Sequence, residues 1–337
     1  MFTKILSNFV VMNLSTPVHI DKSNCEINSS SKIMTLGSCF SEHIGNKLLD
    51  SHFICQSNPF NTVFNPISIG NLLSRSISKE LFTLKEVDQH NNRHFIYDLH
   101  SFYDATEPQK TLENANESIL ATNNLLSGLD CLIITFGTSI GYHHIEQDRL
   151  VSNCHKVPNQ LFERQFLDDQ LMYNSISAAI DQLIEIRPNL HITFTVSPVR
   201  HTKEGLVDNN VSKSKLILLC CKLIAKYSQA SYFPSYEIMM DELRNYRFYD
   251  EDMIHPTQQA VNIIWNRFMD VYFDSSAKEK VSDFQKLNRA FNHLPFDPNS
   301  EGHKSFCNKQ LVEVKRLSQK YSGVDFTTYN NHFNTNK

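Results

Sequence analysis

Short apolar runs with strand character recur along the chain, and segments with apolar residues at helical spacing lie between them. The pattern predicts strands at residues 33–36, 52–56, 131–136, 191–196 and 230–233. It predicts helices after residue 38 and at residues 165–186, 212–227 and 258–273. Strands that alternate with helices form a mostly parallel sheet with helices on both faces. The sequence therefore predicts an α/β fold with a five-stranded sheet.

Three regions fall outside this alternation. Residues 75–125 are more polar and less periodic, which indicates an insertion or lid within one domain that spans residues 16–310. Residues 311–337 form a polar tail whose last ten or so residues we expect to be disordered. Residues 1–15 are interpreted as an N-terminal extension, with a poor signal peptide as the alternative.

Composition excludes several classes of function. The net charge of −4, from 32 basic and 36 acidic residues, gives no reason to expect nucleic acid or an anionic membrane as a partner. Only 9 of the 337 residues are glycine, and neither nucleotide-binding glycine fingerprint occurs, so no cofactor is predicted. The eight cysteines form no C-x-x-C pair, which favours reduced thiols and a cytoplasmic protein. No stretch is long enough to span a bilayer, and no feature indicates an oligomeric state.

A polar cluster follows each of the five predicted strands along the chain. The clusters are residues 37–38, 58–66, 137–139, 197–201 and 252–255. In an open parallel sheet, ligands bind at the carboxyl ends of the strands. The five clusters together therefore predict one site at that edge.

Two of these clusters carry candidate chemistry. Ser38 stands in a tight turn between a strand and a helix, where a serine can act as a nucleophile or as an ordinary helix cap. Asp252 precedes His255 by three residues, so its carboxylate can hold the Nδ1–H of the imidazole and leave Nε2 free as a base. Pro256 suits the first turn of the next helix, which would keep His255 in the loop.

Taken together, the motifs resemble those of the GSCFA family, a branch of the SGNH/GDSL-like hydrolases. The motifs are residues 37–41, with Ser41 where the family name has Ala, and residues 58–66, 135–138, 153–158, 195–201 and 249–256. The resemblance covers roughly residues 16–275. It implies a three-layer α/β/α sandwich of flavodoxin-like order. It also implies a site with Ser38 as nucleophile, His255 as base and Asp252 as the carboxylate that orients it.

This resemblance implies an esterase for O-acyl groups, above all O-acetyl groups, on a carbohydrate or small metabolite. Two alternatives remain open at this stage: an acyltransferase on the same scaffold, and a glycan- or metabolite-binding protein without activity. The oxyanion-binding positions depart from the usual pattern, because relatives carry Gly in the second motif and Asn in the third. The candidate donors here are Ser38, Asn61, Gly137, Thr138 and Asn153.

Other polar residues have two interpretations each. His155, with Lys156, is either a substrate contact or a buried polar brace, and Arg200 and His201 either hold an anionic or sugar group or form a surface ion pair. Cys39 is a weaker candidate nucleophile than Ser38. The spacing of the histidines and cysteines at residues 143, 144, 154 and 155 fits no common structural zinc pattern, so no metal is predicted.

Overall fold

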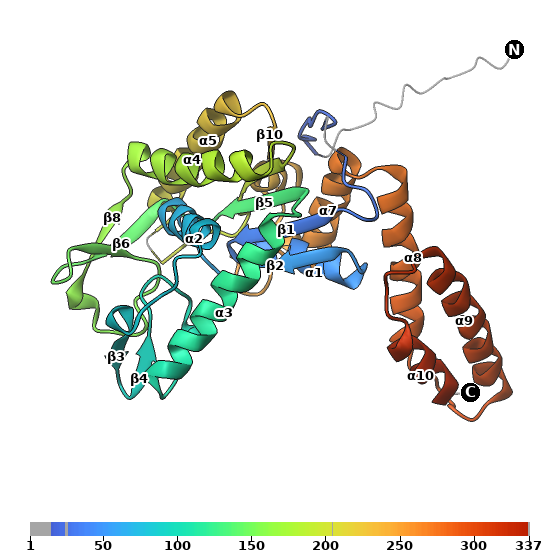
Figure 1. Cartoon of the computed structure of the whole chain (residues 1–337). Coiled ribbons are helices and arrows are strands. Elements are labelled where there is room, and N and C mark those ends of the chain that lie inside the picture. Colours follow the sequence, from blue (N-terminus) through green and yellow to red (C-terminus); the bar gives the residue numbers. More distant parts are fainter. Residues whose placement is uncertain (1–14, 24–25, 204, 336–337) are drawn as a thin grey trace, which may run out of the picture.

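A five-stranded parallel sheet forms the centre of the protein (Figure 1). The computed structural model describes residues 15–23, 26–203 and 205–335. The strands, in the order β10-β9-β5-β1-β2, are β1 (Lys32–Gly37), β2 (Ile54–Ser57), β5 (Cys131–Phe136), β9 (His191–Val196) and β10 (Ala230–Phe233). All neighbouring pairs are parallel. The predicted five-stranded sheet and its flavodoxin-like order are confirmed.

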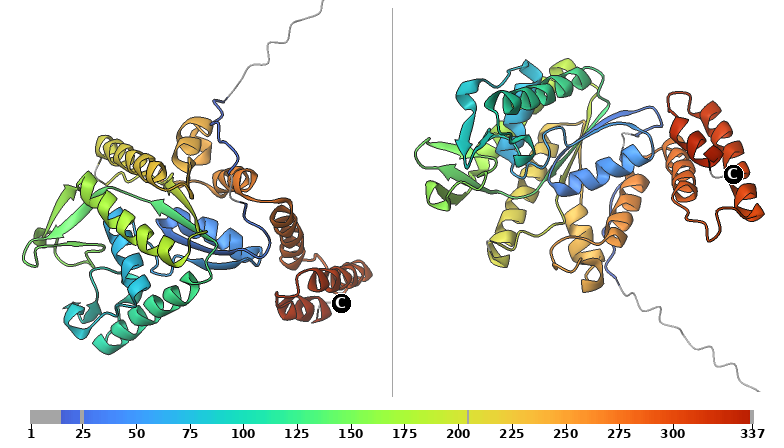
Figure 2. Two further views of the ribbon diagram at one scale, coloured as in Figure 1. Left: turned by 45° about the horizontal axis from the view of Figure 1, so that its top comes forward. Right: turned by 90° about the horizontal axis from the view of Figure 1, so that it is seen from below.

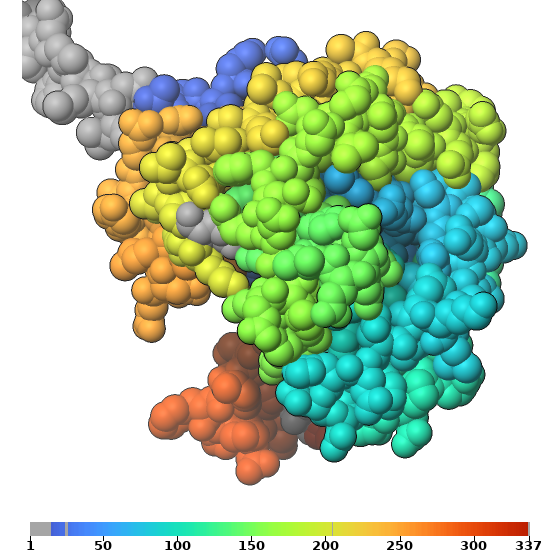
Figure 3. Space-filling view, turned by 90° about the vertical axis from the view of Figure 1, so that its left-hand side faces the viewer, coloured from blue at the N-terminus to red at the C-terminus, as the bar shows by residue number. Residues whose placement is uncertain are grey.

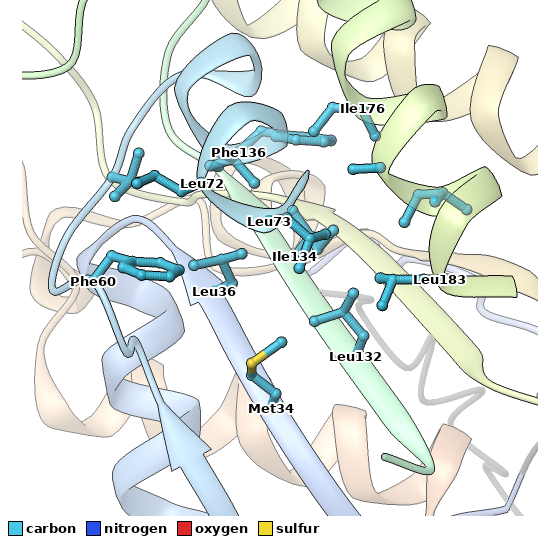
Figure 4. Packing of buried hydrophobic residues seen from close by; sticks show 14 of the residues in the cluster. Met34, Leu36, Phe60, Leu72, Leu73, Leu132, Ile134, Phe136, Ile176 and Leu183 are labelled. Carbon is cyan, nitrogen blue, oxygen red and sulfur yellow. The ribbon is translucent and has the colours of Figure 1, made fainter. Parts of the chain in front are cut away.

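Helices cover both faces of this sheet. One layer consists of α2 (Pro66–Ser78), α3 (Pro108–Leu126), α4 (Asp169–Ile186) and α5 (Leu206–Lys226), and the other of α1 (Cys39–Asp50) and α7 (Gln258–Tyr272). Side chains alternate along a strand, so Met34 and Leu36 of β1 pack in the first layer while Ile33 packs in the second. Figure 4 shows Leu36 and Ile134 beside Leu72 and Leu73 of α2. The arrangement is a three-layer sandwich.

The segment predicted as an insertion or lid contains one of the covering helices. In α3, Ala115, Ile119 and Leu126 are buried against the sheet layer, although most of the helix is polar. A helix with one narrow apolar stripe has a low average hydrophobicity, which explains why its sequence resembles a loop. The rest of the segment contains β3 (Asp88–His90), β4 (Arg93–Phe95), η1 (Leu84–Glu86) and η2 (Ser101–Tyr103).

A second small sheet was not predicted. It has the order β7-β6-β8 and consists of β6 (Ile140–His144), β7 (Arg149–Val151) and β8 (Phe162–Phe166). Since β8 occupies the start of the segment predicted as helix 165–186, that helix begins later, at Asp169. The remaining short turns are η3 (Asn159–Leu161), α6 (Ser235–Glu237), η4 (Ile238–Glu242) and η5 (Tyr246–Phe248).

The C-terminal region is helical as far as Thr335, so the expected disorder of the last ten or so residues is wrong for those that the structure describes. The helices α8 (Ser275–Phe291), α9 (Glu301–Lys320) and α10 (Thr327–Thr335) enclose a core that includes Phe284, Leu317 and Phe333. Figure 2 shows α9 and α10 side by side at one end of the molecule. Each of these helices has few apolar residues, so only the three together bury enough surface to be recognised as a folded unit.

Polar contacts join this helical unit to α1 and the turn after it. The side-chain amide of Asn288 donates to the Asp50 carbonyl over 2.8 Å, and the Tyr329 hydroxyl lies 3.0 Å from the His52 ring. The predicted N-terminal extension lies outside the described residues except for Ser15. Across the residues that the structure describes, no helix combines the length and the apolar character needed to cross a membrane.

Candidate functional site at the carboxyl edge of the sheet

The carboxyl ends of β1 and β5 lie at the point where the chain reverses its direction across the sheet. From β1 the chain goes to β2 on one side, and later it returns to β5 on the other side. Ligands bind at such a switch point in open α/β sheets. Figure 3 shows the end of the molecule that carries β6 and β8, the strands that follow β5 in the chain. Their segment lies at the centre of the view, and the segment of β3 and β4 lies at its lower right.

Ser38 is the residue that joins β1 to α1. It is fully buried, and its side chain makes no hydrogen bond to the helix that it precedes. Its Oγ has no hydrogen-bond partner among the described residues. Gly37, with φ of 134°, allows the close turn, since a Cβ atom there would lie 2.1 Å from the Thr135 carbonyl oxygen. Ser38 is therefore not a side-chain cap, and its hydroxyl has no structural role in the hydrogen bonding of the turn.

Asp252 and His255 form a hydrogen-bonded pair in the loop before α7. Asp252 Oδ2 lies 2.6 Å from His255 Nδ1, and Oδ1 accepts the backbone N–H groups of Ile254 and His255 over 2.8 and 2.9 Å. These hydrogen bonds, first those from His255, lower the pKa of Asp252 to about 2. The carboxylate thus reaches back to the imidazole as the spacing predicts.

Local structure keeps this loop outside α7. The Asp250 N–H donates to the His255 carbonyl over 2.8 Å, and Met253 adopts a left-handed conformation with φ of 59°. Thr257 is the N-cap of α7 and accepts the Ala260 N–H over 3.3 Å. Pro256 therefore precedes the cap rather than lying in the first turn as expected, but His255 is in the loop in either case.

His255 lies near α1 and the segment after β9. Burial lowers the pKa of His43 in the first turn of α1, and the charge of His255 lowers it further. Burial likewise lowers the pKa of His201 to about 4, with Lys213 and His255 contributing. His255 is thus close enough for its charge to act on α1, which begins after Ser38, and on the segment after β9, although Ser38 Oγ makes no hydrogen bond to it. His201 packs edge-on against Phe64 at 5.4 Å and is a partly buried side chain that its low pKa keeps neutral.

The predicted oxyanion donors from the backbone are all engaged within the protein. The N–H of Ser38 donates to the Thr135 carbonyl over 3.0 Å, and the N–H of Asn61 to the Asn58 carbonyl over 2.7 Å. The N–H groups of Gly137 and Thr138 both donate to the Phe64 carbonyl, over 2.8 and 3.1 Å. The expectation that these amides face a substrate is therefore incorrect for this conformation. The loops after β2 and β5 bind each other instead.

Asn58 is a side-chain donor at Ser38 that the sequence analysis missed. Its Nδ2 donates to the Ser38 carbonyl over 3.4 Å, and its Oδ1 is buried without a partner among the described residues. Asn58 adopts a left-handed conformation with φ of 42°, which Asn tolerates better than most residues. The asparagine-rich motif 58–66 was the signal that could have identified it.

Asn153 and His155 lie in a different place, beside a cavity of about 400 Å³ that is also lined by Arg93, Asp104 and Lys156. Asn153 Oδ1 accepts the His155 N–H over 3.1 Å. The His155 ring stacks on Phe95 at 4.3 Å, and its Nε2 donates to the Ile96 carbonyl over 3.0 Å. His155 Nδ1 lies 2.9 Å from Asp104 Oδ1. These contacts support the interpretation of His155 as a buried polar brace.

Lys213 of α5 is a buried cation that the sequence analysis did not single out. Its Nζ donates to the Gly137 and Ser197 carbonyls over 2.7 and 2.8 Å, at the ends of β5 and β9. Burial lowers the pKa of Lys213 to about 7. The neighbouring Ser212 Oγ accepts the Ser139 N–H over 2.7 Å. The sequence signal that could have identified Lys213 is its position on the apolar face of a predicted helix. Its hydrogen bond to Gly137 fixes the loop after β5.

Cys39, His143 and His144, the remaining candidates for a nucleophile or metal ligand, have contacts that favour structural roles. Burial raises the pKa of the Cys39 thiol, which disfavours the reactive thiolate. His143 contacts Asp148 at 3.0 Å, and His144 packs against Phe162 at 5.1 Å. Within the described residues, no group of three or more His, Cys, Asp or Glu side chains could hold a metal ion.

The fold defines an α/β protein with a flavodoxin-like sheet. Comparison with protein families identifies it further: the GSCFA family model matches residues 32–268, and the model of the GSCFA domain protein C-terminal domain matches residues 284–336. The chain belongs to the GSCFA family. The second match covers most of the unit α8–α10, in agreement with its separate core.

Two further comparisons add little. No curated protein matches the chain. A solved structure described as "a putative platelet activating factor from Streptococcus pneumonia" is 11% identical, covers 71% of this chain and 84% of its own, and has a TM-score of 0.35. A likeness this low carries no argument about function.

Proposed function

We propose that the protein is a serine hydrolase of the SGNH type that acts on ester bonds. The observation that carries the proposal is the Asp252–His255 pair, whose 2.6 Å contact uses Nδ1 and leaves His255 Nε2 without a hydrogen-bond partner among the described residues. The unpartnered Ser38 Oγ at the start of α1 supports it, since a nucleophile needs a hydroxyl that is not committed elsewhere.

In the proposed reaction, His255 Nε2 takes the proton of Ser38 Oγ as the oxygen attacks the acyl carbonyl. The C–O bond to the leaving alcohol breaks, and His255 returns the proton to that alcohol. Water then attacks the acyl-enzyme and His255 takes its proton. The bond between the acyl carbon and Ser38 Oγ breaks, His255 returns the proton to Ser38 Oγ, and the acid leaves. Asp252 stays ionised and stabilises the imidazolium in both steps, as its low pKa allows.

The substrate must reach a serine that is fully buried in this structure. The proposal therefore requires the loop of residues 58–66 to move, which would free the amides of Gly137 and Thr138 from the Phe64 carbonyl or present the Asn58 carboxamide to the oxyanion. Loop closure around a bound substrate is a common way to complete such a site. We propose a small-molecule or carbohydrate O-acyl ester as the substrate and the cytoplasm as the location. Free thiols, such as buried Cys220 and exposed Cys221, fit a reducing compartment.

Labelling with a fluorophosphonate probe tests the nucleophile. Wild type should label, Ser38→Ala should not, and Cys39→Ala should label as wild type does. Hydrolysis of p-nitrophenyl acetate by Ser38→Ala should fall by on the order of 10³-fold or more, because the covalent step is lost. Equal labelling of wild type and Ser38→Ala would show that the assignment of Ser38 is wrong.

One observation favours a second candidate, a glycan- or metabolite-binding protein without activity. All four backbone donors predicted for the oxyanion are occupied by carbonyl groups of the protein. Loss of one such donor typically costs about 10²–10³-fold in rate. If wild-type turnover equals that of Ser38→Ala while acetylated sugars still bind, the binding function is the correct one. Acyl transfer, the third possibility, would show as faster release of p-nitrophenol when alcohols are added.

A further inference from the structure

Arg200, the fourth residue after β9, has no hydrogen-bond or ion-pair partner among the described residues. Its Nε is buried and makes no hydrogen bond. The contact that the structure records for its guanidinium is with the ring of Tyr249, whose centroid lies 5.2 Å from Cζ. A ring face attracts the cation but does not satisfy the N–H donors.

Other partly buried arginines of the protein each have a carboxylate. Arg75 pairs with Glu86 at 2.8 Å, and Arg149 pairs with Asp98 at 2.6 Å. A buried donor without an acceptor is unfavourable, and a guanidinium in particular is retained where it binds a planar anion. Arg200 therefore differs from these structural arginines in lacking the partner that would explain its burial.

The position of Arg200 connects it to the proposed catalytic pair. Tyr249 forms a β-bridge with Pro256, the residue after His255, so the ring under the guanidinium belongs to the same loop as the pair. The next residue, His201, is close enough to His255 for their charges to interact. Lys213 also lies behind the ends of β5 and β9, and its Nζ contacts two carbonyls rather than a carboxylate.

We propose that Arg200 binds a carboxylate of the substrate, so that the ester cleaved at Ser38 carries a negative charge. This inference rests on the proposed hydrolase function. A guanidinium offers two parallel N–H donors that match a carboxylate, and a free carboxylate on the substrate would supply the acceptor that Nε lacks. Specificity for an anionic ester follows, with the uncharged ester bound more weakly.

Binding to the full-length Ser38→Ala protein, measured by isothermal titration calorimetry, tests the inference without turnover. The probes are monomethyl succinate and O-acetylglycolate, which carry the anion on the acyl and alcohol sides, and the neutral dimethyl succinate and methyl O-acetylglycolate. At least one anionic ester should bind more tightly than its neutral counterpart. Adding Arg200→Met should weaken that ester by about 10–100-fold and leave the neutral ester unchanged.

Two further variants complete the design. Arg200→Lys keeps the charge without the planar fork and should recover part of the affinity, and it also serves if Arg200→Met fails to fold. Arg247→Met is the matched control, because Arg247 is an exposed arginine of η5 that stacks on Phe248 at 4.7 Å, and it should change neither probe.

Two outcomes would overturn the inference: equal binding of anionic and neutral esters, or an anion preference that survives both Arg200 substitutions. Failure of the hydrolase proposal has a different signature. In that case wild type and Ser38→Ala show the same turnover, whatever the calorimetry finds. Turnover that depends on Ser38 with no anion preference would contradict the role of Arg200 alone.

Discussion

Two of the histidine–aspartate pairs of the protein have opposite electrostatic behaviour. In the loop before α7, Asp252 and His255 are 2.6 Å apart and about half exposed, with 47% and 48% of their side chains accessible. Asp104, which follows η2, and His155, in the loop between β7 and β8, are 2.9 Å apart, with 9% and 0% of their side chains accessible. The pKa of Asp252 is lowered to about 2, whereas burial raises that of Asp104 to about 6.

Burial and backbone donors account for the difference. Asp252 accepts two backbone N–H groups, which stabilise its charged form. Asp104 is removed from water, and burial also lowers the pKa of His155 to about 4. Because His155 Nε2 donates to the Ile96 carbonyl, its Nδ1 presents a lone pair to Asp104, and a proton must lie between them for attraction. The same two residue types thus suit proton transfer in one place and bracing in the other.

The largest expected effect is on kcat, which should depend on His255 but not on His155. On p-nitrophenyl acetate, His255→Gln should lower kcat by about 10²–10⁴-fold, because the general base is lost. His155→Gln should leave kcat nearly unchanged, since His155 contacts no proposed reacting group. A kcat that falls equally in both variants would contradict the division of roles.

The free energy of unfolding should depend more on His155 than on His255, the reverse of the order expected for kcat. His155→Ala removes the stacking on Phe95 and leaves the Ile96 carbonyl and Asp104 unsatisfied, so the free energy of unfolding should fall by about 2–4 kcal/mol. His255→Ala, at an exposed site, should hardly change it. Urea denaturation followed by circular dichroism measures both, and equal losses would show that burial does not distinguish the pairs.

The pH dependence of stability tests the shared proton. Between about pH 4 and 6 the folded pair holds one proton on Asp104, and the unfolded chain holds one on His155, whose unfolded pKa is about 6.5. The two contributions cancel, because Asp104 takes up a proton on folding and His155 releases one. The wild-type pair should therefore add almost no slope in this range.

In Asp104→Asn only the release from His155 remains. Stability should then fall as the pH drops from 6 to 4.5, by up to about 1.4 kcal/mol per pH unit relative to wild type. Urea midpoints at several pH values measure this slope. Parallel curves for the variant and wild type would mean that the pair does not share a proton.

The smallest effect concerns the loop that carries the exposed pair. Thr257→Ala removes the cap of α7 and should cost about 1 kcal/mol, with a modest fall in kcat because the loop is less well held. The matched control is Asp168→Ala, which removes the cap of α4, where Asp168 accepts two N–H groups over 2.9 Å. It should cost similar stability without changing kcat.

Local signals in the sequence were sufficient for the sheet and for the Asp252–His255 pair. Buried parallel strands are continuous apolar runs, as at 131–136, so their positions and the α/β class follow from hydrophobicity alone. A carboxylate three residues before an imidazole in a loop reaches it through local geometry. Both features depend on residues that are close in the chain.

Elements with sparse apolar residues were not predictable in this way. The helices α9 and α10 have polar sequences, and their few apolar side chains gain stability only by packing against Phe284 and its neighbours on α8. The covering role of α3 was missed for the same reason. Their burial depends on segments far apart in the sequence, which no local pattern reports.

The features of the candidate site also divide into those that depend on local sequence and those that depend on long-range packing. The sequence by itself determined the strand positions and the pairing of Asp252 with His255, because these follow from apolar runs and local spacing, and the strand order was implied by the resemblance of its motifs to a known family. Only the tertiary structure decided that His155 is a brace, that Lys213 joins the ends of β5 and β9, and that the predicted oxyanion amides bind the protein's own carbonyls. Burial and hydrogen-bond partners are set by long-range packing, and they control the charge and availability of each group.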